Sequence, residues 1–167
     1  MAANMLTAYY SRGCDSRKLF QGLKIATHPD FEKHLNQYNV IHLNMRDYLT
    51  ESENMKQLIQ FVEDDLLDEL QQEFSDLRMP RRKTLVKVLE QAFAQYKIPF
   101  VFIIDEWDCI FRVHKSDAAS QKEYLDFLRN LLKDKSYIAL AYMTGILPIK
   151  KYGEHSAINV FYEYSMT

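Results

Sequence analysis

Apolar residues recur along much of the chain at the three- and four-residue spacing of amphipathic helices. This spacing predicts long helices over residues 1–11, 55–74, 82–96 and 118–133, and shorter ones over residues 15–20 and 30–38, with a loop over residues 22–29. We expect Gly13 to end the first helix, because glycine adopts the left-handed conformation past a helix end without steric cost. Thr50-Glu51-Ser52-Glu53 matches a capping box and predicts the start of the helix that contains Met55.

Three shorter segments have the pattern of β-strands. Residues 40–44 alternate, residues 100–104 are continuously apolar and rich in β-branched and aromatic side chains, and residues 137–142 form a third run. Because these strands alternate with helices along the chain, right-handed crossovers would place them in one parallel sheet. We therefore expect an α/β fold with three layers, in which the strand at residues 100–104 is central and helices cover both faces.

The composition limits the possible partners and compartments. A chain of 167 residues and 19.8 kDa fits one domain. With 21 Lys and Arg against 23 Asp and Glu, the chain has no bulk positive field for a nucleic acid, and we expect the basic residues at 78–83 to be a solvated loop opposite the acidic face of the 55–74 helix. The longest apolar run, residues 98–104, is too short to cross a membrane. Two cysteines without a secretory leader favour the reducing cytoplasm.

Two carboxylates, Asp105 and Glu106, follow the central strand directly. Ligands bind at the carboxyl ends of parallel strands, and an apolar run that closes in Asp-Glu is the Walker B pattern. In that pattern Asp105 reaches Mg²⁺ through its water shell, and Glu106 polarises the water that attacks the γ-phosphate of ATP. An equal alternative is that Asp105 caps the following turn and that Glu106 faces solvent.

A hydroxyl side chain, Thr144, follows the third strand at the same edge of the sheet. It occupies the place of a residue that senses phosphate, although a threonine there is more commonly a turn former. Asp108 and Arg112 could support the carboxylates, and a loop salt bridge is the simpler interpretation of that pair.

These motifs resemble the AAA-ATPase-like proteins of bacteria, in which a P-loop domain often precedes a restriction-endonuclease-like nuclease domain. The resemblance covers nearly the whole chain and rests on Asn4-Met5-Leu6, Tyr9-Tyr10, Asp15-Ser16, Leu19-Phe20, Gly22-Leu23-Lys24-Ile25, Ile103-Ile104-Asp105-Glu106-Trp107-Asp108 and Met143-Thr144-Gly145-Ile146-Leu147-Pro148-Ile149. It implies that Asp105 and Glu106 are the Walker B pair, that Thr144 is the polar position after the next strand, and that the parent protein uses ATP and Mg²⁺.

One part of the family pattern is missing from the sequence. The four glycines are too dispersed for a G-x-x-x-x-G-K-[ST] phosphate loop, which in the family precedes the helix that residues 1–11 resemble. The expectation is that residues 1–167 are a fragment of one AAA-ATPase-like domain, inactive without its P-loop strand. No [DE]-x-Lys triplet of a nuclease occurs either.

The resemblance also predicts the order of the strands, with residues 40–44 first, residues 101–104 in the middle and residues 138–143 last. The P-loop strand would lie beside the last of these, so we expect an open edge there and self-association of the chain. The alternative function is a nucleotide-independent interaction module with a vestigial Walker B motif, whose aromatic tail from Tyr152 to Tyr164 binds a protein partner.

Overall fold

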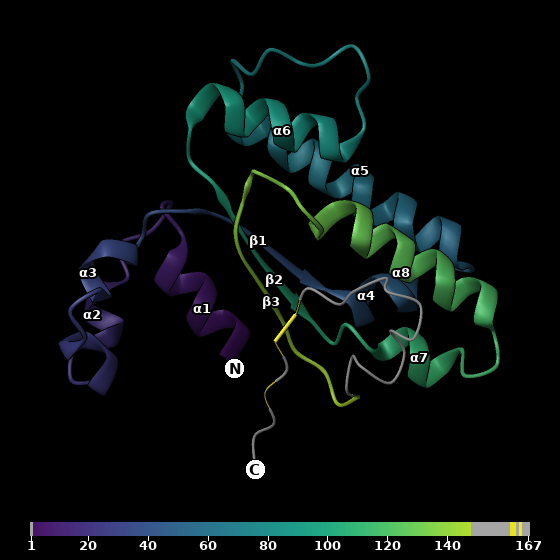
Figure 1. The fold of residues 1–167 in the computed structure, drawn as a ribbon, viewed down its shortest axis with the longest axis horizontal. Coiled ribbons are helices and arrows are strands. Elements are labelled where there is room, and N and C mark those ends of the chain that lie inside the picture. The colour runs from purple at the N-terminus through teal and green to yellow at the C-terminus, as the bar shows by residue number, and fades with distance from the viewer. Residues whose placement is uncertain (1, 148–160, 163, 165–167) are drawn as a thin grey trace.

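Three parallel strands form the sheet at the middle of the molecule (Figure 1). The computed structural model describes residues 2–147, 161, 162 and 164. In that part of the chain the strands are β1 (Asn39–Asn44), β2 (Phe100–Asp105) and β3 (Ile138–Met143), and their order in the sheet is β1-β2-β3. Residue Asn44 is opposite Asp105, and Ile104 is opposite Met143, so the carboxyl ends of the three strands are aligned. The predicted parallel sheet and its strand order are confirmed.

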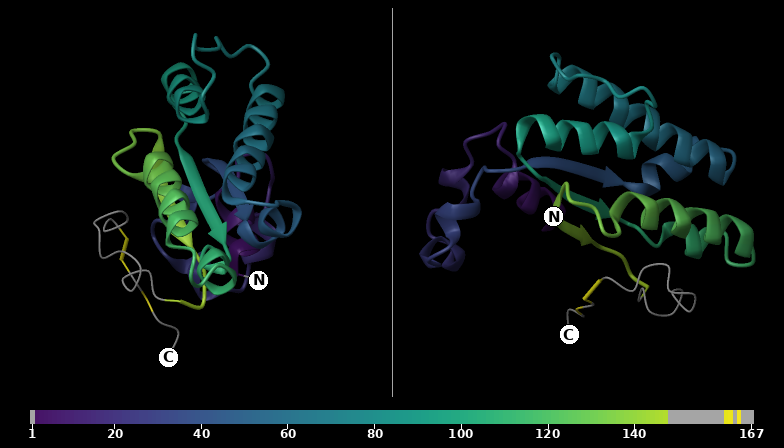
Figure 2. Two further views of the ribbon diagram at one scale, coloured as in Figure 1. Left: turned by 90° about the vertical axis from the view of Figure 1, so that its right-hand side faces the viewer. Right: turned by 45° about the horizontal axis from the view of Figure 1, so that its top comes forward.

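Side chains of β2 alternate between two cores, one on each face of the sheet. On one face, Val101 and Ile103 pack under α1 (Ala2–Tyr10). On the other face, Phe100, Phe102 and Ile104 pack under three long helices, which are α5 (Met55–Glu73), α6 (Leu85–Tyr96) and α8 (Ala118–Leu132). Figure 2 shows these helices and α1 on opposite sides of the strands. The three layers predicted from the sequence are therefore present, and β2 is buried because helices cover both of its faces.

Beyond the end of α1 lies a group of short elements, α2 (Arg17–Phe20), a 3₁₀ turn (Lys24–Thr27) and α3 (Phe31–His34). They close over a small cluster of Phe20, Phe31 and Leu35. The predicted helix over residues 30–38 is too long, because Asn36 has a φ of 56°, which a right-handed helix does not allow. The predicted loop over residues 22–29 contains the 3₁₀ turn.

Two short helices, which the sequence patterns did not predict, come shortly after the ends of strands. Helix α4 (Met45–Glu51) begins after β1, and α7 (Cys109–Val113) begins four residues after β2. Because Thr50 lies inside α4, the predicted capping box is wrong. Helix α5 is capped instead by Asn54, whose side chain accepts a hydrogen bond from the Gln57 N–H at 3.0 Å.

The end of α1 also differs from its prediction. The helix ends at Tyr10, and the next residue, Ser11, pairs with Tyr38 in an isolated parallel bridge. Gly13 is not among the residues with positive φ, so its proposed left-handed cap is wrong. Pairing with the segment before β1 ends the helix.

The surface of the α5–α6 connection is basic, and Arg78, Arg81, Arg82 and Lys83 are exposed there. None of the four forms an ion pair with another residue of the described segments. Among the helices that the structure describes, none combines the length and the apolar character needed to cross a bilayer.

Candidate functional site

Backbone pairing continues past the ends of β2 and β3 and brings two loops together. The Thr144 N–H donates to the Ile104 carbonyl at 2.9 Å, and the Trp107 N–H donates to the Thr144 carbonyl at 3.1 Å. The segment that holds the two carboxylates is therefore held beside the segment that holds Thr144. Both are at the carboxyl edge of the sheet, where parallel α/β proteins bind ligands.

The side chain of Asp105 is half-buried at this edge and is held by two hydrogen bonds. Its Oδ1 accepts one from the Glu106 N–H at 3.1 Å and one from the hydroxyl of Thr144, a residue 39 positions away in the chain. Oδ2 makes no hydrogen bond with a described residue. The structure thus brings Asp105 and Thr144 together, and the bond to Glu106 shows that Asp105 also caps its own turn.

Glu106 has a left-handed backbone conformation, with a φ of 54°. A residue with a Cβ atom adopts this conformation at a cost of about 1–2 kcal/mol. Its carboxylate forms an ion pair with Arg112, in which the Glu106 and Arg112 side chains are 33% and 30% exposed. The hydrogen bond between them raises the pKa of the Arg112 guanidinium above its usual value. The partner of Glu106 is therefore Arg112 rather than solvent alone.

Residues 1–153 match the model of the AAA-ATPase-like family, which is described as "Predicted AAA-ATPase". The chain belongs to this family. No curated protein and no solved structure matches the sequence significantly. The family resemblance predicted from the motifs is confirmed, whereas the P-loop type of its sheet stays a prediction.

In this AAA-ATPase-like chain, Asp108 is the most buried polar residue near the carboxylates, with none of its side chain exposed. Its Oδ2 accepts hydrogen bonds from the backbone N–H groups of Ile146 and Leu147, at 3.1 and 2.9 Å. Arg112 Nε lies 3.3 Å from the same oxygen as an ion-pair contact. The expected salt bridge between Asp108 and Arg112 is confirmed. Asp108 also holds the segment after Thr144 in place through its two backbone hydrogen bonds.

A buried tyrosine of α8, inside the helix predicted over residues 118–133, also holds this site. The hydroxyl of Tyr124 on α8 donates to the Trp107 carbonyl at 2.9 Å. Complete burial raises the pKa of Tyr124 well above its ordinary value, so the hydroxyl keeps its proton and remains a donor. The signal in the sequence was weak, because the residue lies in the apolar stripe of α8. Its phenol is the only polar tip on that stripe, and a buried tyrosine hydroxyl usually has a partner.

The carboxylates at this edge suit a cation that is coordinated by both the protein and a bound ligand, rather than a cation that the protein coordinates alone. Within the described ranges no group of three or more His, Cys, Asp or Glu residues could hold a metal ion. Mg²⁺ is typically bound by one or two carboxylates, several waters and phosphate oxygens. Asp105 fits that role, because Oδ2 is not engaged by a described residue and Thr144 fixes the carboxylate at Oδ1.

Proposed function

We propose that this AAA-ATPase-like domain takes part in the binding and hydrolysis of ATP with Mg²⁺, and that Asp105, Glu106 and Thr144 form the metal and water side of the site. The observation that carries the proposal is the hydrogen bond from Thr144 to Asp105 at the carboxyl end of the central strand. It joins the polar groups that follow two neighbouring strands at the edge where such sheets bind ligands. Family membership supports the nucleotide as the ligand.

Asp105 would hold Mg²⁺ through the water shell of the ion, with Oδ2 as the acceptor. Bound Mg²⁺ would neutralise charge on the β- and γ-phosphates. The Thr144 hydroxyl and the Glu106 N–H both donate to Oδ1, so they fix the rotamer of the carboxylate and keep the second oxygen directed away from them. Thr144 is in this respect a positioning residue.

Glu106 would orient the attacking water by accepting a hydrogen bond from it. In the structure its carboxylate is already engaged by Arg112 through an ion pair. The ion pair uses Oε2 of Glu106, so Oε1 would be the oxygen that accepts the hydrogen bond from water.

The phosphates need a second set of groups. The 167 residues contain no G-x-x-x-x-G-K-[ST] loop, whose backbone N–H groups and lysine hold the β- and γ-phosphates. Residues 1–167 would therefore form one part of an ATPase domain, and groups outside this sequence would hold the phosphates. Hydrolysis has to be measured on the complete product of the gene.

The decisive experiment is the substitution Glu106→Gln in that complete product, with steady-state ATP hydrolysis and nucleotide binding measured in parallel. We expect nucleotide binding to be retained and kcat to fall about 10²-fold or more, because a positioned general base contributes about 10²- to 10⁴-fold. Asp105→Asn should instead raise the Mg²⁺ concentration that gives half-maximal rate, because the amide is a poor partner for the water shell of the ion.

Glu32→Gln is the matched control. Glu32 is also a glutamate paired with an arginine, Arg17, and it lies on α3 far along the chain from the site. Its substitution removes one exposed ion pair and should leave kcat unchanged. A Glu106→Gln protein that hydrolyses ATP at the full rate would show that the proposed role of Glu106 is wrong.

A second candidate function is nucleotide-independent binding of a protein partner by the aromatic tail. The described part of that tail supports it, because Tyr162 and Tyr164 are 89% and 88% exposed. Residues 152–160 and 163 lie outside the described residues. If ATP neither binds to nor is hydrolysed by the complete gene product, this candidate replaces the first.

A further inference from the structure

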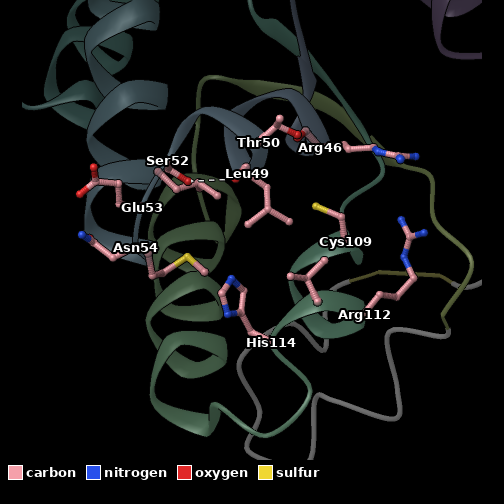
Figure 3. Close-up of a pocket in the computed structure, with 12 residues that line it drawn as sticks. Arg46, Leu49, Thr50, Ser52, Glu53, Asn54, Cys109, Arg112 and His114 are labelled. Carbon is pink, nitrogen blue, oxygen red and sulfur yellow. Dashed lines mark hydrogen bonds between the residues drawn. The ribbon is translucent and has the colours of Figure 1, made fainter.

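A pocket of about 510 Å³ lies next to the candidate site (Figure 3). It is formed by α4, the turn between α4 and α5, the beginning of α5 and helix α7. Asp105, Glu106 and Thr144 do not line it. Arg112 does, so this one side chain belongs both to the pocket and to the ion pair with Glu106.

The floor of the pocket is apolar and continuous with the main core. Leu58 is completely buried, and Met55 and Cys109 are 4% and 3% exposed, so these side chains are fixed by packing. Burial raises the pKa of the Cys109 thiol to about 11, which keeps this side chain uncharged at neutral pH. At the mouth, Val113 is 65% exposed and extends the apolar wall into solvent. Such a floor fits the hydrocarbon part of a ligand.

Two arginines give the pocket a cationic side. Figure 3 shows the guanidinium groups of Arg46 and Arg112 on the same side of the pocket, and the carboxylate of Glu53 on the opposite side. Arg46 is exposed, and its side chain makes no hydrogen bond or ion pair with a described residue. Because Arg112 is paired with Glu106 and Asp108, Arg46 is the cation at this side of the pocket that has no carboxylate partner among the described residues.

We propose that the pocket binds a small organic anion with an apolar body, such as a medium-chain carboxylate. The charged group is received by Arg46 and Arg112, and the hydrocarbon lies on Leu58, Met55 and Val113. An exposed arginine without a partner is a suitable donor for a carboxylate, since the guanidinium offers two parallel N–H groups. A molecule that has only the negative charge, or only the hydrocarbon body, would contact only one of these two groups of residues.

Binding at this pocket is coupled to Glu106 through Arg112. The Arg112 guanidinium already forms an ion pair with Glu106, and its Nε lies 3.3 Å from Asp108 Oδ2. An added anion therefore competes with these two carboxylates for the single positive charge of Arg112. By linkage, whatever weakens the Glu106–Arg112 pair strengthens anion binding, and the anion in turn weakens the pair. This competition involves no nucleotide, so it is tested on residues 1–167 alone and does not depend on the proposed ATPase function.

The test is a two-dimensional NMR titration of the chain with sodium octanoate, compared with 1-octanol and with acetate. We expect octanoate to shift the amide signals of residues 45–58 and 109–114 in a saturable way. Octanol lacks the charge and acetate lacks the apolar body, so each should bind at least about tenfold more weakly, as expected when a charge-assisted contact or a buried chain is lost.

Four substitutions locate the ligand and test the coupling. Arg46→Gln should weaken octanoate binding about three- to tenfold, which is the range for a partly exposed charge contact, while Arg81→Gln should not change it. Val113→Trp should abolish binding, because the larger side chain fills the mouth of the pocket. Val113 is exposed, so the fold tolerates this substitution. Glu106→Gln should tighten binding about two- to fivefold, because Arg112 then lacks its main carboxylate partner, whereas Glu32→Gln should have no effect.

Each result decides a part of the proposal. If octanoate produces no saturable shift, or if octanol binds as well as octanoate, the pocket is not an anion site. If Arg46→Gln has the same affinity as the parent chain, the ligand lies elsewhere. If Glu106→Gln does not tighten binding, Arg112 does not couple the two sites.

Discussion

Gly145 lies two residues after the end of β3, where the backbone passes very close to two fixed side chains. A Cβ atom at this position would lie 2.7 Å from Asp108 Oδ1 and 2.7 Å from the indole nitrogen of Trp107. Neither side chain can move easily, because Asp108 is completely buried and Trp107 is 3% exposed. The absence of a side chain at Gly145 is therefore required for the loop after Thr144 to lie against the carboxylates.

This close approach predicts that Gly145→Ala lowers the free energy of unfolding by about 1–3 kcal/mol, the usual cost of overpacking. Equilibrium urea unfolding followed by circular dichroism measures the change. Gly13→Ala is the control, since the nearest atom to its added Cβ would be Ser11 Oγ at 3.7 Å, an ordinary contact. If both substitutions have the same effect, the close packing of Gly145 is not what stabilises this loop.

At the scale of single residues, the sequence identified the carboxylates and placed Thr144 at the same edge of the sheet, but it did not predict which residue pairs with Glu106. Asp105 and Glu106 could be found because they follow an apolar strand immediately. The ion pair of Glu106 with Arg112 could not, because it depends on a left-handed conformation at Glu106 and on a short helix that no periodicity indicated. The burial of Asp108 was not predictable either, since its N–H donors are 38 and 39 residues away.

The start of α5 shows how a local motif can be displaced by its neighbour. Thr50 and Glu53 have the spacing of a capping box, but α4 extends to Glu51 and includes Thr50, whose hydroxyl donates to the Arg46 carbonyl. The box is instead formed four residues later, with Asn54 bonded to the Gln57 N–H and the Gln57 side chain accepting from the Glu53 N–H at 2.6 Å. The pair differs from a standard capping box in one respect, because Gln57 accepts from the residue before the N-cap rather than from Asn54 itself.

We therefore predict that Asn54→Ala lowers the free energy of unfolding by about 1 kcal/mol, the typical cost of losing a helix N-cap. Thr50→Ala should cost less than about 0.5 kcal/mol, because it removes only an exposed side chain from the surface of α4. Thermal and urea unfolding of the two proteins provide the comparison. A larger loss for Thr50→Ala than for Asn54→Ala would place the helix boundary at Thr50.

At the scale of elements, the long helices and the three strands could be predicted, whereas the shortest helices could not. A helix of five to seven residues, such as α7 or α4, has too few turns for a periodic pattern. Its stability comes from buried contacts instead, which are Met45 in α4 and Ile110 and Phe111 in α7. These contacts exist only once the sheet has placed the two strand ends side by side.

At the scale of the whole molecule, the two edges of the described sheet have different chemistry. The outer strand β1 carries the polar residues Asn39, His42 and Asn44. The other outer strand, β3, has neither a charged residue nor a proline from Tyr137 to Met143, and its Leu140 and Tyr142 are each 37% exposed. Charges and prolines are the usual protection of a strand edge against a second strand. Neither outer strand of the described sheet contains Asp, Glu, Lys, Arg or Pro, so β3 differs from β1 by its exposed apolar side chains, which a second strand would cover.

We predict that two copies of the chain associate through β3 at high concentration, by pairing of the open edges and burial of Leu140 and Tyr142. Light scattering coupled to size exclusion should give a mass that rises above 19.8 kDa with concentration. Ala139→Lys should keep the chain monomeric, since Ala139 is exposed and a charge there opposes docking of a second strand, whereas Ala141 is half-buried against the core and is unsuitable. Ala94→Lys adds the same charge to an exposed position on α6 and should associate like the parent chain. A parent chain that remains monomeric at millimolar concentration, or an Ala94→Lys chain that dissociates as readily as Ala139→Lys, would contradict pairing at this edge.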